Sequence, residues 1–314
     1  NIEKAKEFIV SQLNTMDMDL STVVGLGGTA RAISRTIIKK ENYPLNTLHG
    51  FEYKVKENLE LFEEIITANS QKELKALGVR KDRFDTMAVG TLIFKTILEY
   101  FNTQKVITSG VGVREGVFLS DLLRSNNDKF PENFNISVRS LLDRFVDDQS
   151  QSGYLGNNAK KIFDILTPIH NLDTKYRSIL VIASKLQLVG LSLEYYKSQS
   201  HNFWYILNGL NYGFTHEEKL LIAMVCKFTK KTLPKKSDIK EYEKLLPELE
   251  VIQWLNFMMT LNMTLNLEFS KEKFEYRIED EILTIRSNKD LYLIKNQLEN
   301  IKSPGQIKIR FETI

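Results

Sequence analysis

The first third of the chain alternates between helix-like and strand-like spacing of its apolar residues. Residues 4–13 have the pattern of an amphipathic helix, whereas residues 21–27 form a short β-branched run that ends in glycines, as a buried strand does. The helical spacing after this run brings four apolar residues to one face or near it: Ala30, Ala32, Ile33 and Ile37. A strand, a glycine turn and a helix in this order predict one α/β unit.

The same order of elements recurs once more before residue 130. Residues 87–101 predict a strongly apolar helix, and residues 105–109 predict a second buried strand. A second glycine-containing segment and another predicted helix follow this strand. Between the two α/β units, residues 55–67 and 70–77 have the pattern of surface helices.

From residue 137 onward the pattern changes to helices alone and then to a mixed tail. The helical part contains predicted helices at residues 138–146, 154–167, 174–189, 197–208 and 216–230. The tail is expected to hold helices at 248–263 and around 289–300, a hairpin of 274–278 and 282–286, and a half-buried strand at 306–311. We therefore expect an α/β plus all-α fold with three domains, at residues 1–130, 131–236 and 237–314.

Composition narrows the class of protein only broadly. Hydrophobic residues make up 42% of the chain and charged residues 26%, as in a globular protein, and no apolar run approaches the roughly 20 residues that span a bilayer. The single cysteine, Cys226, excludes an internal disulfide framework and suits a reducing cytoplasm. The net charge of +3 does not indicate a specific nucleic-acid partner. We expect a cytoplasmic protein without a membrane partner, and a fragment, since the chain begins at Asn1 inside a helical pattern with no signal peptide.

The first glycine turn has the composition of a phosphate-binding turn. Gly25, Gly27 and Gly28 allow a ligand to approach the backbone or allow a positive φ. The helix that follows offers N–H groups and a partial positive charge to a phosphate, and Thr29 could cap this helix or donate its hydroxyl. A tight strand-to-helix turn with no ligand explains the same residues equally well.

The second glycine turn repeats this design around charged residues. Gly110, Gly112 and Gly116 surround Arg114 and Glu115. An arginine in such a turn can bind phosphate oxygens with both arms of its guanidinium. It can also pair with Glu115 or with a carboxylate of a neighbouring helix, and we favour this structural role.

Three segments taken together resemble a known family. The order GLGGTARAI (25–33), RFDTMAVGTLIF (83–94) and SGVGVREGVFL (109–119) is similar to the second half of the bacterial exopolyphosphatase/guanosine pentaphosphate phosphohydrolases, the Ppx/GppA family. The resemblance implies an incomplete actin-like (ribonuclease H-like) domain, an HD-like all-helical domain and a small α/β tail. It also implies magnesium-assisted hydrolysis of terminal phosphate from inorganic polyphosphate or guanosine pentaphosphate by the complete protein. The residues that it assigns to the phosphate or nucleotide side of the cleft are Gly27, Gly28, Thr29 and Arg31.

The departures from the family pattern concern catalysis. The family's general base is a glutamate between the two halves, and its phosphate loops are Asp-Gly-Ser/Thr turns; nothing before Ser21 matches either. We therefore expect both to lie upstream of Asn1, name no catalytic residue, and expect no activity from the chain by itself. Two alternatives stay open: an actin-like sugar or acid kinase, which the HD-like domain disfavours, and a non-catalytic module that binds guanosine polyphosphates.

The HD-like domain lacks the ligands of a metal site. Gln187 and Leu188 occupy the positions of the expected His-Asp pair, and Gln151 and Thr229 those of two further histidines, so that His201 alone matches the pattern. We expect no metal here, and instead a role in extending a binding surface or forming a homodimer. The other histidines are expected to be isolated and exposed: His49, His170 and His216.

Basic clusters offer a second kind of anion site. Five lysines near the end of the helical region could attract a polyanion: Lys227, Lys230, Lys231, Lys235 and Lys236. Lysines also favour a helix C-terminus for electrostatic reasons alone, and we prefer this explanation. Two smaller clusters, Lys39–Lys40 and residues 80–83, are expected on solvated faces.

Overall fold

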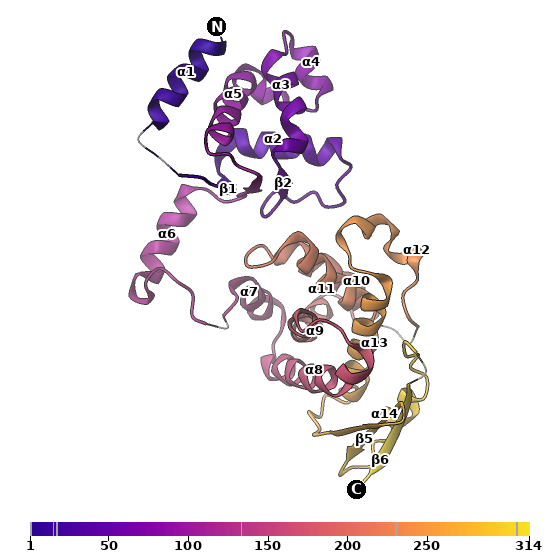
Figure 1. Cartoon of the computed structure of the whole chain (residues 1–314). Coiled ribbons are helices and arrows are strands. Elements are labelled where there is room, and N and C mark those ends of the chain that lie inside the picture. The colour runs from indigo at the N-terminus through magenta and orange to yellow at the C-terminus, as the bar shows by residue number, and fades with distance from the viewer. Residues whose placement is uncertain (1, 15, 17, 133, 230–231, 306) are drawn as a thin grey trace. The chain divides into compact units, whose positions relative to one another are not determined.

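The computed structural model describes residues 2–14, 16, 18–132, 134–229, 232–305 and 307–314. The chain divides into two compact units, Asn1–Glu132 and Asn133–Ile314 (Figure 1). Within the described residues, no helix combines the length and the apolar character that crossing a membrane requires.

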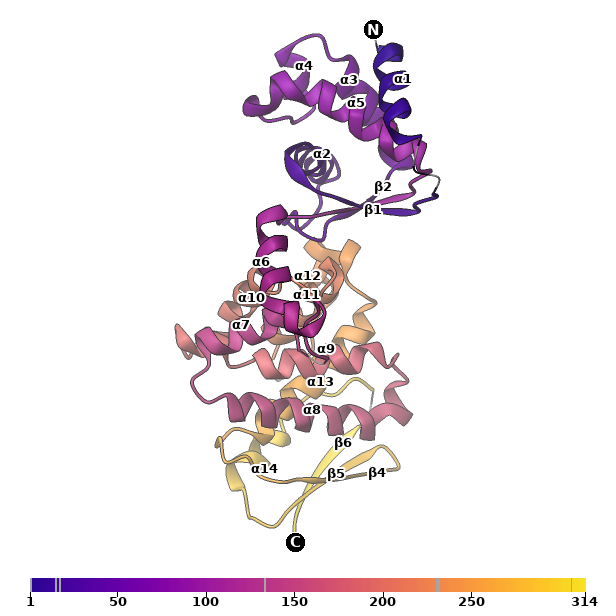
Figure 2. The same cartoon turned by 90° about the vertical axis from the view of Figure 1, so that its left-hand side faces the viewer.

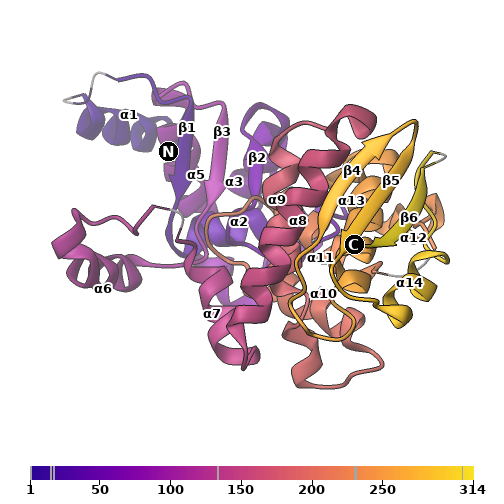
Figure 3. The same cartoon turned by 90° about the horizontal axis from the view of Figure 1, so that it is seen from below.

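The first unit is built on a small mixed sheet. Its strands are β1 (Thr22–Gly25), β2 (Glu52–Lys54) and β3 (Lys105–Thr108), in the order β1-β3-β2 (Figure 3). β1 and β3 run parallel, with Gly25 opposite Thr108, and β2 pairs antiparallel with β3. The two predicted strands are confirmed, whereas the three-residue strand β2 had no signal in the hydrophobic pattern.

Among its described residues the first unit has six helices. They are α1 (Ile2–Leu13), α2 (Gly27–Lys40), α3 (Leu59–Thr67), α4 (Gln71–Ala76), α5 (Phe84–Tyr100) and α6 (Val113–Leu123), with short 3₁₀ turns at Lys56–Asn58, Lys81–Arg83 and Arg124–Asn126. α2 lies over the sheet, with α3 and α5 on its far side, whereas α6 extends away from the sheet on the side opposite α2 (Figure 2). Ile33 and Ile37 of α2 are fully buried in one core with Phe62 of α3 and Val106 of β3, as the helical spacing predicts.

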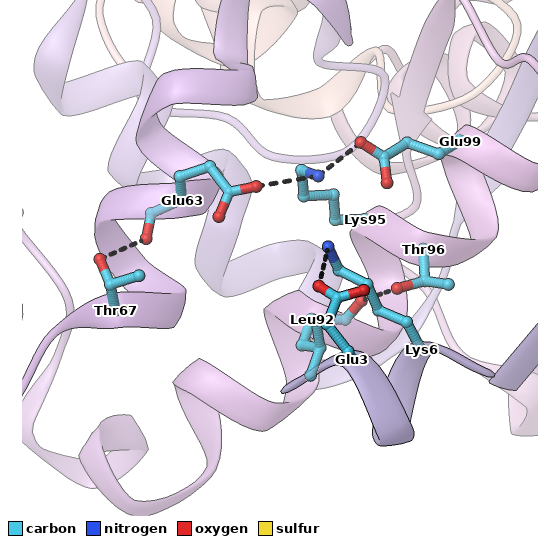
Figure 4. Close-up of polar contacts among 8 residues, drawn as sticks. All are labelled: Glu3, Lys6, Glu63, Thr67, Leu92, Lys95, Thr96 and Glu99. Atoms are coloured by element: carbon cyan, nitrogen blue, oxygen red, sulfur yellow. Dashed lines mark hydrogen bonds and ion pairs between the residues drawn. The ribbon is translucent and has the colours of Figure 1, made fainter. Parts of the chain in front are cut away.

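A buried lysine ties α3 to α5. The Lys95 side chain is only 8% exposed, and its ammonium pairs with Glu63 of α3 at 2.9 Å and with Glu99 one turn away (Figure 4). Burial alone would lower the pKa of Lys95, but the hydrogen bonds to Glu99 and Glu63 raise it above its ordinary value. The charge therefore stays compensated in the folded unit.

The second unit is mainly helical. Its longer helices are α7 (Ile136–Phe145), α8 (Gln149–His170), α9 (Lys175–Leu186), α10 (Ser198–Gly209), α11 (His216–Lys227) and α13 (Leu249–Leu265), and its short ones are α12 (Lys236–Ile239), α14 (Tyr292–Leu298) and the 3₁₀ turns Val189–Ser192 and Lys240–Leu245. α13 is apolar around most of its circumference, and it contacts α8, α9, α11 and α14. The five helices predicted between residues 138 and 230 correspond to α7 through α11.

A three-stranded sheet completes this unit. β4 (Glu275–Glu279) and β5 (Ile282–Ser287) form the predicted hairpin, and β6 (Lys308–Thr313) pairs parallel with β5. The Tyr276 hydroxyl donates a hydrogen bond to Oδ1 of Asn158 at 2.7 Å, and the Asn158 amide donates to Oδ1 of Asn262 at 2.9 Å. This buried network connects β4 with α8 and α13 inside one compact unit. The expected boundary between a helical domain and a C-terminal α/β domain at residues 236–237 stays a prediction.

Candidate functional site

The two glycine turns meet at the carboxyl ends of β1 and β3. The Ser109 N–H donates a hydrogen bond to the Gly25 carbonyl at 2.9 Å, and the buried hydroxyls of Ser34 and Thr108 lie 2.6 Å apart. In α/β sheets, ligands bind outside the carboxyl ends of parallel strands. We therefore expect a ligand of the first unit to bind beside these two turns.

The first turn is tighter than the sequence suggested, because α2 begins at Gly27 rather than at Thr29. The N-cap residue is Leu26, and it makes no side-chain capping bond, so the predicted capping role of Thr29 is wrong. Gly27 adopts φ +95°, which L side chains rarely adopt, and this position requires glycine. The N–H groups of the first helical turn have no acceptor within the helix and carry a partial positive charge.

The Thr29 side chain points to a neighbouring helix. A Cβ atom added to Gly90 of α5 would lie 2.7 Å from the Thr29 hydroxyl oxygen. Gly90 therefore allows α5 to approach α2 closely, and the threonine hydroxyl fills this contact. Thr29 can offer a phosphate its backbone N–H, while its hydroxyl faces α5.

Two arginines approach the first turn of α2. A Cβ atom added to Gly28 would lie 2.7 Å from Nη1 of Arg83, so the guanidinium covers the glycine directly. The Nε–H of Arg31 donates to the Gly27 carbonyl at 3.1 Å, which holds this second guanidinium beside the same turn. Arg83 lies on a solvated face as predicted, with its side chain 44% exposed and its Nε 3.8 Å from an Asp82 oxygen, and from that face its guanidinium reaches Gly28. Guanidinium groups and N–H groups together suit a phosphate.

Two side chains accept hydrogen bonds from the backbone of the second turn. A Glu115 carboxylate oxygen accepts the Gly112 N–H at 2.8 Å, and the Gly110 N–H donates to Nδ1 of His49 at 3.1 Å. The pKa of Glu115 is lowered, first by the hydrogen bonds from its own N–H and that of Gly112, and then by the charges of Arg114 and Arg31.

Beyond the second turn, α6 presents an apolar face to solvent. Its exposed apolar side chains are Val113, Val117, Phe118 and Leu122. No residue of α6 is buried. A pocket beside it is lined by residues of both turns, among them Leu26, Gly112 and Arg114. The site therefore continues into an open surface that carries the exposed apolar side chains of α6 and charged groups of both signs, Arg114 and Arg124 with Asp121 and Asp128.

Two histidines are buried, contrary to expectation. His170 is 6% exposed, its Nε2 lies 3.1 Å from the Phe163 carbonyl, and its Nδ1 accepts the Leu172 N–H at 2.9 Å. Burial lowers the pKa of His170, and the bond to Phe163 opposes this in part. His216 is 2% exposed, while His49 is half-buried. A neutral imidazole whose two nitrogens are bonded can be buried at low cost, which periodicity does not reveal.

Three of the positions assigned to missing metal ligands come together in the second unit. Gln187, Leu188 and Thr229 line one pocket, and Gln151 donates a hydrogen bond to the carbonyl of Phe269, which also lines it. His201 lies in a different pocket, 3.7 Å from a Glu194 oxygen. Among the described residues no cluster of three His, Cys, Asp or Glu side chains could hold a metal ion. The expectation of a metal-free domain stays a prediction.

The lysine cluster is only partly described, because Lys230 and Lys231 lie outside the described residues. The Lys227 ammonium lies 4.7 Å from the centre of the Phe203 ring, and Lys236 pairs with Glu243 at 3.5 Å. Lys235 is the N-cap residue of α12. Lys227 and Lys236 thus have partners of their own, and polyanion binding by this cluster stays a prediction.

Comparisons with known proteins cover both units. The Ppx/GppA phosphatase family matches residues 1–125, and Ppx/GppA phosphatase, domain III, matches residues 135–302. The guanosine-5'-triphosphate,3'-diphosphate pyrophosphatase of Aeromonas hydrophila is 27% identical over 203 residues, which cover 64% of this chain and 39% of that protein. The protein of the same name from Aeromonas salmonicida has the same identity and coverage.

The chain thus spans about two-fifths of the length of these curated relatives. A crystal structure of the Aquifex aeolicus member of the Ppx/GppA family matches 40% of this chain and 41% of that one, with 27% identity and a TM-score of 0.35. The domain III match alone covers more than half of the chain. The chain belongs to the Ppx/GppA phosphatase family.

Proposed function

We propose that this chain forms part of a phosphohydrolase that removes terminal phosphate from inorganic polyphosphate or guanosine pentaphosphate. In this proposal the first unit is half of an actin-like domain, and the carboxyl ends of β1 and β3 form one wall of its substrate cleft. Family membership and the name of the Aeromonas relatives support a phosphoanhydride substrate. Both candidate substrates are polyanions that end in a phosphoanhydride.

The observation that carries the proposal is the pair of guanidinium groups at the first turn of α2. Arg83 lies over Gly28, and Arg31 is anchored on the Gly27 carbonyl. A phosphate placed there would accept hydrogen bonds from these groups and from the N–H groups of the helix. No carboxylate among the described residues is hydrogen-bonded to the first turn of α2, and Glu115 is hydrogen-bonded to the Gly112 N–H.

These residues bind and orient phosphate; we assign no catalytic base to the chain. Magnesium remains part of the proposal, since Mg²⁺ is usually held by one or two carboxylates together with substrate phosphates. The described residues of the two turns do not fit a protein cage for this ion, because the Glu115 carboxylate already accepts backbone N–H groups. No step of the reaction is therefore assigned to Mg²⁺ here.

Calorimetric titration with tripolyphosphate and with guanosine pentaphosphate tests the site. We expect Arg83→Gln to weaken binding of both compounds about tenfold, which corresponds to about 1.4 kcal/mol for one lost charge-assisted contact. Arg80→Gln is the matched control. It removes the same charge three residues away, from an arginine that pairs with the same Asp82, whereas only Arg83 of the two lies over Gly28.

Equal weakening by both variants would mean that only net charge matters and would overturn the assignment of the site. We also expect the chain by itself to release no phosphate from either compound, because it supplies binding groups without an assigned base. Magnesium-dependent phosphate release above that of a heat-inactivated control would contradict this second expectation while leaving the binding site intact.

A further inference from the structure

A groove between α7 and α10 of the second unit combines accessible aromatic rings with a positive charge. It has a volume of about 390 Å³, within the lower range of small-molecule sites. Its walls come from α7, from α10 and from the segment that precedes α10, and they include Phe145, Trp204 and Tyr205. Every residue that lines it belongs to the second unit, so the groove shares no residue with the phosphate site of the first.

The two helices that form the groove are fixed against each other at both of its ends. A Cβ atom added to Gly209 at the end of α10 would lie 2.6 Å from Cδ2 of Leu141 on α7, so the helices approach closely there. At the start of α7, the Asn135 amide donates a hydrogen bond to the carbonyl of Tyr212, just after α10, at 3.1 Å. A ligand that enters a groove of this kind does not have to order its walls, which favours binding.

Trp204 offers an accessible ring on the wall of this groove. Its side chain is 60% exposed, whereas the second tryptophan of the chain, Trp254, is 4% exposed. The Trp204 ring lies edge-to-face against the ring of Phe203, with the ring centres 5.3 Å apart, and this contact holds it in position. An aromatic side chain that is held in place and open to solvent can stack on a planar ligand.

Arg144 places a guanidinium beside the aromatic wall. It lines the groove, is exposed, and lies with its guanidinium carbon 4.9 Å from the centre of the Phe145 ring. Within the described part of the chain no carboxylate pairs with Arg144, whereas His201, which also lines the groove, lies 3.7 Å from a Glu194 oxygen. A guanidinium stacked on a ring keeps its in-plane N–H groups for an anion. The charge that a ligand would have to balance is therefore that of Arg144.

We propose that this groove binds a nucleotide, with the base stacked on Trp204 and a phosphate on the Arg144 guanidinium. Aromatic side chains stack on all four bases, and guanidinium groups bind phosphate oxygens with two parallel hydrogen bonds. A ligand without a ring would not use the indole, and a ligand without an anion would leave the guanidinium unpaired. A nucleotide supplies both groups, joined by its sugar.

Titration of the chain with the four ribonucleoside 5'-monophosphates tests the proposal, followed by calorimetry and by tryptophan fluorescence. Nucleosides provide the base without the phosphate, and ribose 5-phosphate provides the phosphate without the base. We expect saturable quenching of the fluorescence by at least one monophosphate, because Trp204 is the accessible one of the two tryptophans. The corresponding nucleoside should bind more weakly, and ribose 5-phosphate should cause no quenching.

Two variants separate the contributions of the ring and the charge. Arg144→Gln should weaken binding of the monophosphate about tenfold and leave the affinity for the nucleoside unchanged, because the phosphate contact alone is lost. Trp204→Ala should weaken binding of both compounds about tenfold, because both stack on the indole. Arg139→Gln is the matched control: it removes the same charge from the same helix, but Arg139 pairs with Asp143 at 2.8 Å and does not line the groove. We expect it to retain full affinity.

Arg83→Gln distinguishes this groove from the phosphate site of the first unit. This variant removes a contact proposed for that site and should leave the quenching by nucleotides unchanged. Four results would each overturn the proposal: no saturable quenching by any monophosphate, equally strong quenching by ribose 5-phosphate, equal weakening by Arg144→Gln and Arg139→Gln, or full nucleotide affinity in Trp204→Ala.

Discussion

The two glycine turns of the first unit follow neighbouring parallel strands, yet different forces hold them in place. The first is enclosed by other elements: Gly28 lies beneath Arg83, Thr29 packs on Gly90, and α2 buries its apolar face. The second is anchored at its start, where Ser109 bonds to Gly25 and Gly110 to His49, but from Gly112 onward it depends on the local bond to Glu115, and the helix that follows buries none of its residues. Two similar glycine turns thus lead to two different helices. α2 is packed into the core, whereas α6 is an exposed helix, called the open arm below.

This difference separates two tasks that a phosphate site requires. Groups that must stay in position belong on the enclosed turn, where packing on α5 and the sheet restricts them. The arm formed by α6 owes its helical form to local bonds, and its apolar face is exposed. Changes to the first turn, and to Gly110 where the second turn contacts His49, should therefore affect the whole unit, whereas changes within α6 should act locally.

The largest effect is expected from Gly27→Val. The backbone at Gly27 has φ +95°, which a β-branched residue adopts only under strain, and the expected loss of stability is about 3 kcal/mol. Thermal unfolding followed by circular dichroism measures it. Leu26→Val is the matched control, because it places the same side chain on the adjacent extended residue, φ −102° and ψ 154°, and should be nearly neutral.

Unfolding at the same temperature in Gly27→Val and Leu26→Val would show that the first turn is not constrained in this conformation. The first turn would then be no more constrained than the second. A selective loss in Gly27→Val, together with weaker tripolyphosphate binding, would instead connect the strained turn to the anion site.

A smaller effect is expected from Gly110→Ala. The added Cβ would lie 2.7 Å from Cβ of His49 and 3.3 Å from its backbone nitrogen, and these atoms cannot rotate away. We expect a loss of about 1–2 kcal/mol from this overpacking. Denaturant titration of the chain measures it, and a neutral result would mean that the contact with His49 is looser than the structure indicates.

Glu115→Ala should act on α6 alone. The carboxylate accepts the Gly112 N–H at the start of this helix, and its removal should speed amide exchange across residues 112–123 without changing the melting temperature. Glu115→Gln is the matched control, since the amide oxygen can still accept the bond. A fall in melting temperature for Glu115→Ala would show that α6 supports the unit.

The same carboxylate gives this local effect a pH dependence. The pKa of Glu115 is lowered in the folded chain, so the cap contributes above the ordinary value of 4.5 and is lost as the pH falls through the lowered pKa. Exchange across α6 in the parent chain should therefore approach that of Glu115→Ala in acid. A constant difference between the two down to the lowest accessible pH would contradict the capping role.

The sequence predicts the individual helices and strands of the first unit better than it predicts how they pack against one another. The spacing of Ile33 and Ile37 reveals the buried face of α2, and the β-branched runs reveal β1 and β3, because periodicity reports burial within one element. The placement of Arg83 over Gly28 joins residues 55 positions apart, so it depends on how α5 packs against α2. No local pattern shows such a contact.

The candidate site could likewise be predicted in its local sequence features but not in its contacts between distant residues. Glycines at 27 and 28 indicate a turn that a phosphate can approach, and the structure adds that only Gly27 has a positive φ. The burial of His170 was not predictable, since it depends on partners that its neighbours in sequence do not specify. In the second unit, the groove that joins Trp204 to Arg144 becomes visible only once α7 and α10 lie together.

The smallest effect, and the most direct test of the open arm, is expected from Gly116→Ala. Gly116 lies inside α6, and an added Cβ would meet no atom within 4 Å. Alanine should favour the helix by about 0.5–1 kcal/mol, because glycine loses more backbone freedom when it becomes helical. Since α6 buries nothing, this gain should slow amide exchange across residues 113–123 and leave the melting temperature of the unit unchanged. A rise in the melting temperature would mean that α6 folds together with the rest of the first unit, and the two turns would then be held by the same kind of packing.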